Sequence, residues 1–256
     1  MTDKIDADKI EFGFIKKVIH LDTVGSTNDE CRNLAFNGAE EGTLVIADEQ
    51  TGGRGRMGRV WSSPKGEGIW MSLILRQNIN PYHVSSVTLL AGLAVCRALR
   101  SFVIDAVIKW PNDVWINGKK VCGILTEMSA SQDGIDFVIV GIGVNVNTSI
   151  FPQELENIAC SLYTETNKKY ERNTVIAEIW HQFGLYYDGF AERGFSAIKN
   201  EYEKYCTNIG KRVNVLCDDG YEALAMGIDD SGSLVVLKDN GEKTAVFSGE
   251  VSIRNI

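Results

Sequence analysis

The sequence is poor in the residue types that build metal clusters, disulfide frameworks and membrane anchors. It has only 3 histidines and 6 cysteines in 256 residues, and no two cysteines form a Cys-x-x-Cys pair. Such scattered residues argue against a zinc site, and in a chain of this length they favour reduced thiols in a cytoplasmic protein. No apolar run reaches transmembrane length, and the charged N-terminus does not resemble a signal peptide.

Positive charge is scarce as well. The chain holds 26 Lys and Arg against 34 Asp and Glu, which gives a formal net charge of -8. Non-specific binding to nucleic acid or to a membrane surface is therefore not expected. A hydrophobic content of 44% in 256 residues is ample for a packed core, and it predicts one large domain or one domain with a small appendage.

Against this acidic background, residues 52–59 collect four glycines and three arginines. Glycine lets backbone N–H groups approach a ligand closely, and arginine can hold a carboxylate or phosphate with two parallel hydrogen bonds. A solvated turn is the alternative interpretation. The flanking segments read as buried strands, however, and Arg54, Arg56 and Arg59 would repel one another in an empty loop. These features predict a mobile loop that closes over a small anion.

Two further segments combine polar side chains with element ends. Ser26, Thr27 and Asn28 begin a predicted helix, where they could hold a polar ligand atom or merely cap the helix, with Thr27 and Glu30 in a capping box. Residues 109–113, Lys-Trp-Pro-Asn-Asp, end a predicted strand with a carboxylate. Such a carboxylate suits magnesium, although an aspartate that stabilises a turn is an equal alternative.

A pair of lysines enters the next predicted strand. If Lys120 lies on the same face as Cys122 and Ile124, its ammonium sits among apolar side chains and needs an anion nearby. Lys119 is then an ordinary solvated turn residue. The later run of residues 141–147 carries glycines that would permit close approach, and Asn145 there could read a base edge. Gln50, Trp61 and Glu127 are further plausible pocket residues.

Hydrophobic periodicity and turn signals divide the chain into elements. Helices are predicted at about 27–38, 81–101 (opened by Pro81), 153–163, 173–190 and 195–206. Strands are predicted at about 14–22, 43–49, 68–75, 107–110, 114–116, 120–129 and 135–147, with an Asn117-Gly118 hairpin turn. From residue 211 only short strands remain, separated by turn signals such as Asp218-Asp219-Gly220, which is typical of a small β-barrel. The predicted parts are a flexible leader (1–13), a main domain (14–207) and a small C-terminal domain (208–256).

Taken together, these segments closely resemble biotin–protein ligase. The resemblance rests on Ser26-Thr27-Asn28, Gln50-Thr51, the run from Gly53 to Trp61, the Lys109–Asp113 run, Lys120 with Gly123-Ile124-Leu125, and the 141–145 run. Residues 249–254 also resemble the end of the family's C-terminal barrel. The resemblance implies an α+β fold, with a mixed, mostly antiparallel sheet packed with helices as in class II aminoacyl-tRNA synthetases and biotin ligases. A small C-terminal SH3-like β-barrel would complete it.

The same resemblance implies functional roles. Biotin would be bound by Ser26, Thr27, Asn28, Gln50, Gly53, Arg54, Gly55, Arg56, Lys120, Gly123 and Leu125. ATP would be bound by Arg56, Arg59, Trp61, Asn112, Lys120 and Asn145. Lys120, Arg56 and Arg54 would act in catalysis, and Asp113 would hold Mg²⁺. The implied reaction makes biotinyl-5'-AMP from biotin and ATP, then transfers biotin to a lysine of a biotin carboxyl carrier protein domain.

Two departures from the family pattern and two rival functions accompany this interpretation. Cys160 stands where many members have threonine, and about 13 residues before the first strand are too few for the winged-helix DNA-binding domain of larger members. The resemblance therefore implies a monofunctional form. A lipoate or octanoate ligase or transferase, with Cys122 as a nucleophile, is one rival, and a non-catalytic regulator that binds biotinyl-adenylate is the other. An edge strand could pair two subunits in a homodimer.

Overall fold

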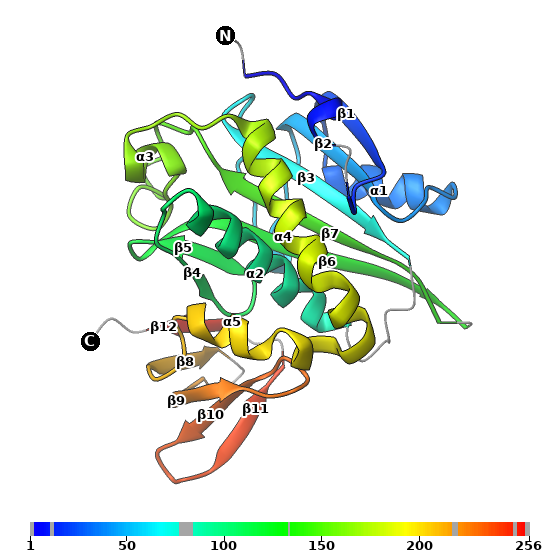
Figure 1. The fold of residues 1–256 in the computed structure, drawn as a ribbon. Coiled ribbons are helices and arrows are strands. Elements are labelled where there is room, and N and C mark those ends of the chain that lie inside the picture. The colour runs from blue at the N-terminus through cyan, green and yellow to red at the C-terminus, as the bar shows by residue number, and fades with distance from the viewer. Residues whose placement is uncertain are drawn as a thin grey trace.

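Two β-sheets organise the protein (Figure 1). The structure is a computed structural model that describes residues 3–10, 13–76, 84–132, 134–216, 220–247 and 250–253. Within these residues the larger sheet has the strand order β1-β2-β3-β7-β6-β5-β4, and the smaller has the order β11-β10-β9-β8-β12. Only the β1–β2 pair of the larger sheet is parallel. The predicted α+β class with a mostly antiparallel sheet is therefore confirmed.

The strands and most of the helices occur in the predicted order. The larger sheet contains β1 (Lys17–Val24), β2 (Thr43–Gln50), β3 (Gly68–Leu75), β4 (Ala106–Lys109), β5 (Asp113–Ile116), β6 (Lys119–Ser131) and β7 (Gly134–Asn145). The smaller sheet contains β8 (Arg212–Leu216), β9 (Tyr221–Ile228), β10 (Leu234–Lys238), β11 (Lys243–Val246) and β12 (Glu250–Ile253). The α-helices are α1 (Thr27–Phe36), α2 (Val84–Ser101), α3 (Leu162–Thr166), α4 (Arg172–Arg193) and α5 (Lys199–Tyr205).

Three short 3-10 turns complete the described elements: η1 (Ala7–Lys9), η2 (Arg56–Gly58) and η4 (Gly194–Ala197). The hairpin turn between β5 and β6 is as predicted, since Asn117 and Gly118 both have positive φ angles, 49° and 79°. Several predicted features lie outside the described residues: Pro81 as a helix opener, Asp218-Asp219 of a predicted turn, and Gly249 with Arg254 of the predicted barrel end.

Two predicted elements are wrong. The expected helix over 153–163 is a series of turns, and the only helix there, α3, begins after the N-cap Ser161. Ile158 is 59% exposed, so the segment lacks the buried apolar face that stabilises a short helix. Residues 3–10 of the expected flexible leader instead pack on the protein. Ile10 is only 1% exposed, and the Asp3 carboxylate pairs with Arg172 at the start of α4.

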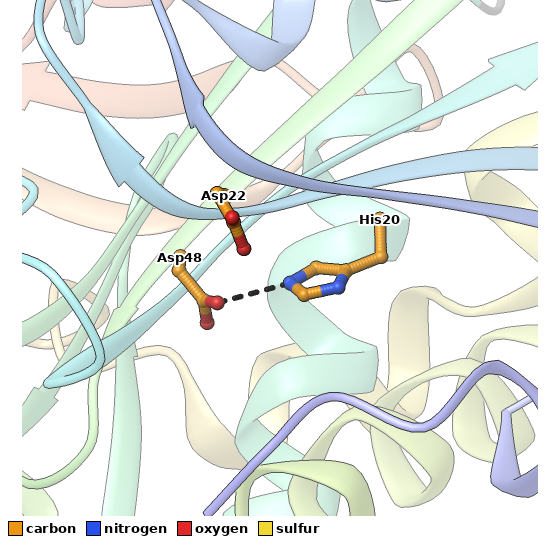
Figure 2. Close-up of side chains that lie close together, drawn as sticks. All are labelled: His20, Asp22 and Asp48. Atoms are coloured by element: carbon orange, nitrogen blue, oxygen red, sulfur yellow. Dashed lines mark hydrogen bonds and ion pairs between the residues drawn. The ribbon is translucent and has the colours of Figure 1, made fainter.

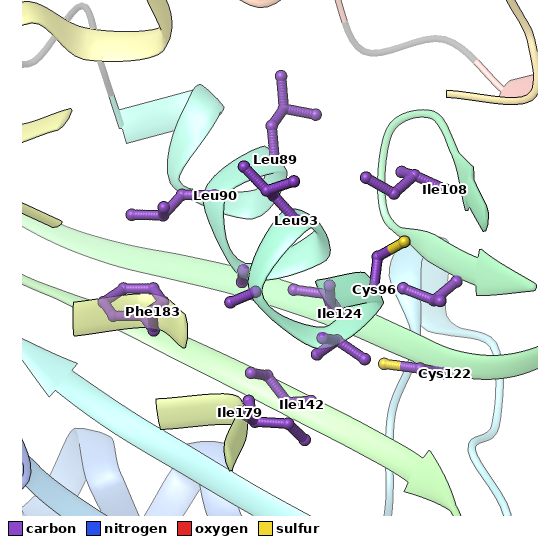
Figure 3. Packing of buried hydrophobic residues seen from close by; sticks show 14 of the residues in the cluster. Leu89, Leu90, Leu93, Cys96, Ile108, Cys122, Ile124, Ile142, Ile179 and Phe183 are labelled. Atoms are coloured by element: carbon purple, nitrogen blue, oxygen red, sulfur yellow. The ribbon is translucent and has the colours of Figure 1, made fainter. Parts of the chain in front are cut away.

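The main hydrophobic core lies between one face of the larger sheet and helices α2 and α4. Figure 3 shows Ile124 and Ile142 of β6 and β7 beneath Leu93 and Cys96 of α2, with Phe183 of α4 alongside. By length and composition α2 could cross a membrane, although no span of transmembrane length was predicted. However, 72% of it is buried inside the protein, and the core helix of a soluble protein has the same character.

The opposite face of the larger sheet is covered only in part. Helix α1 packs there over a small second core that includes Cys31, Val45 and Ile74. At the other edge of the sheet, hydrogen bonds join Trp110, which directly follows β4, to two segments beside the strands of the smaller sheet. The Trp110 backbone N–H donates to the Asn208 side-chain oxygen (2.8 Å), and the Trp110 indole donates to the Gly232 carbonyl (3.0 Å). The sheet face beside α1 is where the polar segments converge.

Candidate active site

Three glycines of β6 and β7 make room for large side chains on the sheet face beside α1. A Cβ atom at Gly141 would lie 2.1 Å from the Asn28 side-chain oxygen, and one at Gly143 would lie 2.4 Å from the Trp61 indole nitrogen. Gly123 lies under the same indole, with 3.0 Å from its virtual Cβ to a ring carbon. The sequence predicted close approach at this run, and the side chains that approach are those of Asn28 and Trp61.

The start of α1 is held by a buried hydrogen-bond network. The backbone N–H and hydroxyl of Thr27 both donate to the Gln50 side-chain oxygen, at 2.9 and 3.0 Å. The Ser72 hydroxyl lies 2.7 Å from the Thr27 hydroxyl and 2.6 Å from the Asn28 oxygen. The predicted capping box with Thr27 as N-cap is therefore wrong. Ser26 is the N-cap, and the Thr27 N–H, which has no partner within the helix, donates to Gln50 of β2. Ser26, Thr27 and Asn28 are each at most 5% exposed.

Lys120 reaches the site through a β-bulge. The β5–β6 pairing shifts register so that Trp115 faces Lys120 and Val114 faces Cys122, which leaves Val121 as the extra residue. A bulge resets the alternation of side chains along a strand. The Lys120 ammonium consequently lies on the Gly123 face, opposite Cys122 and Ile124, and the predicted placement beside those two residues is wrong.

The Lys120 ammonium nevertheless has the predicted anion beside it. It lies 2.7 Å from an Asp113 carboxylate oxygen and 5.2 Å from the centroid of the Trp61 ring. Lys119, as expected, turns away, and its ammonium donates to the Glu156 backbone carbonyl at 2.9 Å. The site thus has a lysine held between a carboxylate and an indole face.

The Gly/Arg loop, residues 51–63, folds as a small hairpin. Trp61 N–H donates to the Gly53 carbonyl at 2.9 Å, and Gly55 N–H donates to the Arg59 carbonyl at 2.7 Å. Met57 takes a left-handed φ of 56° within this turn. Gly53 is also tightly enclosed, because a Cβ there would lie 2.5 Å from the Trp61 carbonyl.

Protein groups hold Arg54 and Arg56 of the loop. Arg54 is gripped by both carboxylate oxygens of Asp29 at 2.6 and 2.7 Å, and Arg56 donates to the Asn112 side-chain oxygen at 3.1 Å. The expectation that mutual repulsion of the arginines requires a ligand is therefore wrong for Arg54, whose charge is balanced by Asp29. Arg59 is exposed.

Asn145 lies buried at the end of β7, where its side-chain N–H donates to the Cys160 carbonyl at 3.0 Å. Leu125, also predicted as pocket wall, is partly exposed on β6, and its carbonyl lies 3.3 Å from the Asn28 amide nitrogen. Asn145 therefore contacts Cys160, the residue that departs from the family pattern. The contact is made by the Cys160 backbone carbonyl and not by its side chain.

Cys122 is an inert core residue. Its thiol is fully buried in the apolar layer under α2, as Figure 3 shows, and burial raises the pKa of this thiol far above its ordinary value. A nucleophilic cysteine needs the thiolate, which this environment suppresses. The arrangement on the glycine-lined face therefore supports charge stabilisation by Lys120 and Arg56. All five described cysteines are buried, and burial raises the pKa of each thiol.

Three residues that sequence reasoning missed connect this site to α1. Asp29 holds Arg54, Arg32 bridges Asp29 and Glu127 at 2.9 and 2.8 Å, and Ser72 joins Thr27 to Asn28. The charged sequence of the first two turns of α1 was the available signal. Their partners, however, come from segments distant in the chain.

A separate group of possible metal ligands lies on β1 and β2, at the far edge of the sheet from Asp113. Figure 2 shows His20, Asp22 and Asp48 facing one another, with the His20 Nε2 atom 3.1 Å from an Asp48 oxygen. The other Asp48 oxygen binds the buried Arg172 guanidinium at 2.8 Å. A cation here would be opposed by that positive charge, and the Asp48 carboxylate is already held by His20 and Arg172.

Known proteins are similar to this chain in sequence and in fold. The biotin/lipoate A/B protein ligase family matches residues 21–145, and the biotin protein ligase C-terminal domain matches residues 209–254. A bifunctional ligase/repressor BirA of Bacillus spizizenii is 42% identical over 98% of this chain and 79% of its own. A biotin–[acetyl-CoA-carboxylase] ligase of Paracoccus denitrificans is 33% identical over 82% of this chain and 90% of its own.

A solved structure agrees. Biotin protein ligase from Aquifex aeolicus, in complex with biotin and ATP, superposes with a TM-score of 0.82 at 32% identity, and the match covers 94% of this chain and 100% of that one. The chain belongs to the biotin/lipoate A/B protein ligase family.

Proposed function

We propose that this protein is a biotin–protein ligase. It activates biotin with ATP to biotinyl-5'-AMP and transfers the biotinyl group to a lysine ε-amine of a carrier protein. The observation that carries this function is the grouping of Lys120, Asp113, Arg56 and Asn112 beside the buried polar network of α1. Similarity to ligases whose structures contain biotin and ATP supports the same assignment.

Activation joins two anions, and the site supplies fixed cations for it. The biotin carboxylate attacks the α-phosphate of ATP, the bond to the β-phosphate breaks, and pyrophosphate leaves. Negative charge develops at phosphorus, where Lys120 and Arg56 can stabilise it without reorganising. Arg56 is already oriented by Asn112 and Lys120 by Asp113, so both cations are positioned before the reaction. We assign Lys120 and Arg56 to catalysis.

Transfer then uses the energy stored in the mixed anhydride. The neutral amine of the acceptor lysine attacks the biotinyl carbonyl, AMP leaves, and the amine loses a proton. The adenylate is open to hydrolysis by water until this happens. The Gly/Arg loop, with Gly53, Gly55 and Arg59, is proposed to lie over it and exclude water.

The two ends of biotin and the nucleotide take different parts of the site. Buried hydroxyl and amide groups suit the polar ureido ring, which we assign to Ser26, Thr27, Asn28 and Gln50. Gly123 and Leu125 would form the wall beside it. Trp61, whose indole N–H has no partner among the described residues, is assigned with Asn112 and Asn145 to the nucleotide side.

Magnesium fits the oxygen donors of this site. The Asp113 carboxylate is a hard ligand of the kind that Mg²⁺ uses together with substrate phosphates, and Lys120 pairs with one of its oxygens, whereas the Asn112 amide oxygen already accepts from Arg56. The phosphates of ATP would supply the negative charge that lets a cation bind beside Lys120. When bound, Mg²⁺ would neutralise phosphate charge. Chelation by EDTA is expected to abolish adenylate formation, and Asp113→Asn is expected to raise the Mg²⁺ concentration that is needed. Unchanged activity in EDTA would remove the metal from the assignment.

The acceptor is proposed to be a biotin carboxyl carrier protein domain, and the small sheet is proposed to be an SH3-like barrel that begins near Asn208. Asn208 is fully buried and contacts Trp110, so this boundary would be a packed joint. A homodimer, a cytoplasmic location and the absence of nucleic-acid binding remain predictions. So does the monofunctional form.

The rival transferase predicts a different chemistry at Cys122. If that cysteine were a nucleophile, Cys122→Ala would abolish transfer. We expect Cys122→Ala to keep most activity and to lose about 1 kcal/mol of stability through the missing buried sulfur. The fully buried thiol beneath α2 favours this outcome.

The decisive experiment supplies the protein with ATP, Mg²⁺ and either biotin or lipoate, together with an acceptor carrier domain. Mass spectrometry of the acceptor should show a biotinyl adduct on one lysine and none with lipoate. Replacement of that lysine by arginine is the control. Modification by lipoate alone would favour the rival ligase, and binding of biotinyl-adenylate without transfer would favour a regulator.

A further inference from the structure

Asp29 of α1 makes a contact that the reaction itself does not require. Both of its oxygens bind the Arg54 guanidinium, at 2.6 and 2.7 Å, in the two-pronged geometry that gives arginine–carboxylate pairs their specificity. The hydrogen bond from Arg54 also lowers the pKa of Asp29, which means that the folded protein stabilises the ionised carboxylate. Arg54 lies in the Gly/Arg loop, and this pair ties that loop to α1.

The tie extends into the site. Asp29 also accepts from Arg32 at 2.9 Å, Arg32 pairs with Glu127 at 2.8 Å, and Glu127 accepts from the Asn28 amide at 2.6 Å. Charges therefore alternate along the row Arg54, Asp29, Arg32, Glu127, and the row ends on a residue proposed to bind biotin. A continuous set of contacts thus connects Arg54 of the Gly/Arg loop to Asn28, at the proposed biotin end of the site.

We propose that Asp29 is a positioning residue that holds the Gly/Arg loop over the site through Arg54. This inference rests on the proposed ligase function. It gives Arg54 the role of an anchor, whereas the resemblance assigns Arg54 directly to biotin and catalysis. With the anchor in place, Arg56 two residues further on meets Asn112.

The consequence is a specific effect on the bound intermediate. Loss of the pair should let the loop open more often, so that biotinyl-adenylate leaves or is hydrolysed before an acceptor arrives. The contact is partly exposed, with side-chain exposures of 40% for Arg54 and 42% for Asp29, so its strength is moderate. We expect a roughly three- to tenfold faster loss of adenylate in Asp29→Asn.

The test measures adenylate retention. Enzyme loaded with radiolabelled biotinyl-adenylate is diluted without acceptor, and the label that remains bound is followed with time. Asp239→Asn is the matched control, because Asp239 holds Arg212 through both of its oxygens on the small sheet, away from the loop. Asp29→Asn should lose label faster than wild type, and Asp239→Asn should not.

A double-mutant cycle separates anchoring from direct catalysis. If Arg54 acts through Asp29, then Arg54→Gln added to Asp29→Asn should cause little further loss, because the contact is already gone. Additive losses would show that Arg54 acts directly on the substrate and would overturn the proposal, as would wild-type retention in Asp29→Asn. If wild type forms no adenylate at all, the proposed function fails instead.

Discussion

The two faces of β6 and β7 have different roles, although alternate residues of the same two strands form them. One face carries Ile124 and Ile142, which are each 2% exposed and pack under α2. The other carries glycines at positions 123, 141 and 143, over which Trp61 and Asn28 lie. Bulky side chains on one side give stability, and missing side chains on the other leave room for chemistry. Stability and activity should therefore respond separately to substitutions one residue apart.

The largest expected effect is on the reacting face. Lys120→Ala removes a cation from the developing negative charge and should slow adenylate formation by roughly a hundred- to a thousandfold. The measurement is single-turnover formation of biotinyl-adenylate. Lys119→Ala is the neighbouring control, since its ammonium binds a backbone carbonyl away from Asp113, and it should change the rate little. Equal losses in both variants would mean that the bulge at Val121 does not separate the two lysines.

Lys120 also shows where sequence reasoning stops. The segment was identified correctly, and so was the need for a nearby anion, because both follow from residue types. The face of the sheet that carries Lys120 was not identified correctly. Simple alternation places Lys120 on the same face as Cys122, but a bulge at Val121 moves it to the opposite face. A bulge arises from the pairing of two strands, and neither strand shows it alone.

Other successes and failures divide in the same way. The strands β2 and β3 and the Asn117-Gly118 turn were predictable because local pattern and turn chemistry determine them. The capping of α1 by Gln50 and the pairing of Asp29 with Arg54 were not, because each joins residues more than 20 positions apart. The site residues were named through a resemblance, and their contacts required the fold.

The second prediction adds one carbon to the empty face. A Cβ at position 143 would lie 2.4 Å from the Trp61 indole nitrogen, so Gly143→Ala must displace the ring. Displacement of a group beside the reacting atoms typically costs about ten- to a hundredfold. We expect a drop of that size in kcat/KM for ATP. Wild-type kinetics in Gly143→Ala would show that the position of the Trp61 indole does not affect the reaction.

The third prediction removes one carbon from the packed face. Ile142→Val leaves a small cavity beneath α2 and should lower the free energy of unfolding by about 0.5–1.5 kcal/mol. In a protein of this size that corresponds to a fall in Tm of roughly 2–4 °C for each kcal/mol. Activity per folded molecule should stay at the wild-type level. A clear fall in activity per folded molecule would show that the packed face also affects the reaction, and it would contradict the separation of the two faces.

The smallest expected effect concerns the anchor between loop and helix. The Arg54 contact lowers the pKa of Asp29 below its ordinary value of 3.8, and Arg32 adds to this. Because the folded-state pKa lies below that of the unfolded chain, the pair contributes stability above about pH 4 that is lost as the pH falls through the folded pKa. Solvent exposure of the pair keeps this contribution below roughly 1 kcal/mol.

Carboxyl carbon NMR can follow this titration directly. In wild type the Asp29 signal should titrate below pH 3.8, and in Arg54→Gln its midpoint should move upward, toward the ordinary value. Arg32→Gln leaves the two-pronged contact in place and should move the midpoint less, since Arg54 is the larger cause. If Arg32→Gln moved it more, Asp29 would serve mainly to hold helix α1 together, and its link to the reacting face through Arg54 would be the weaker of its two contacts.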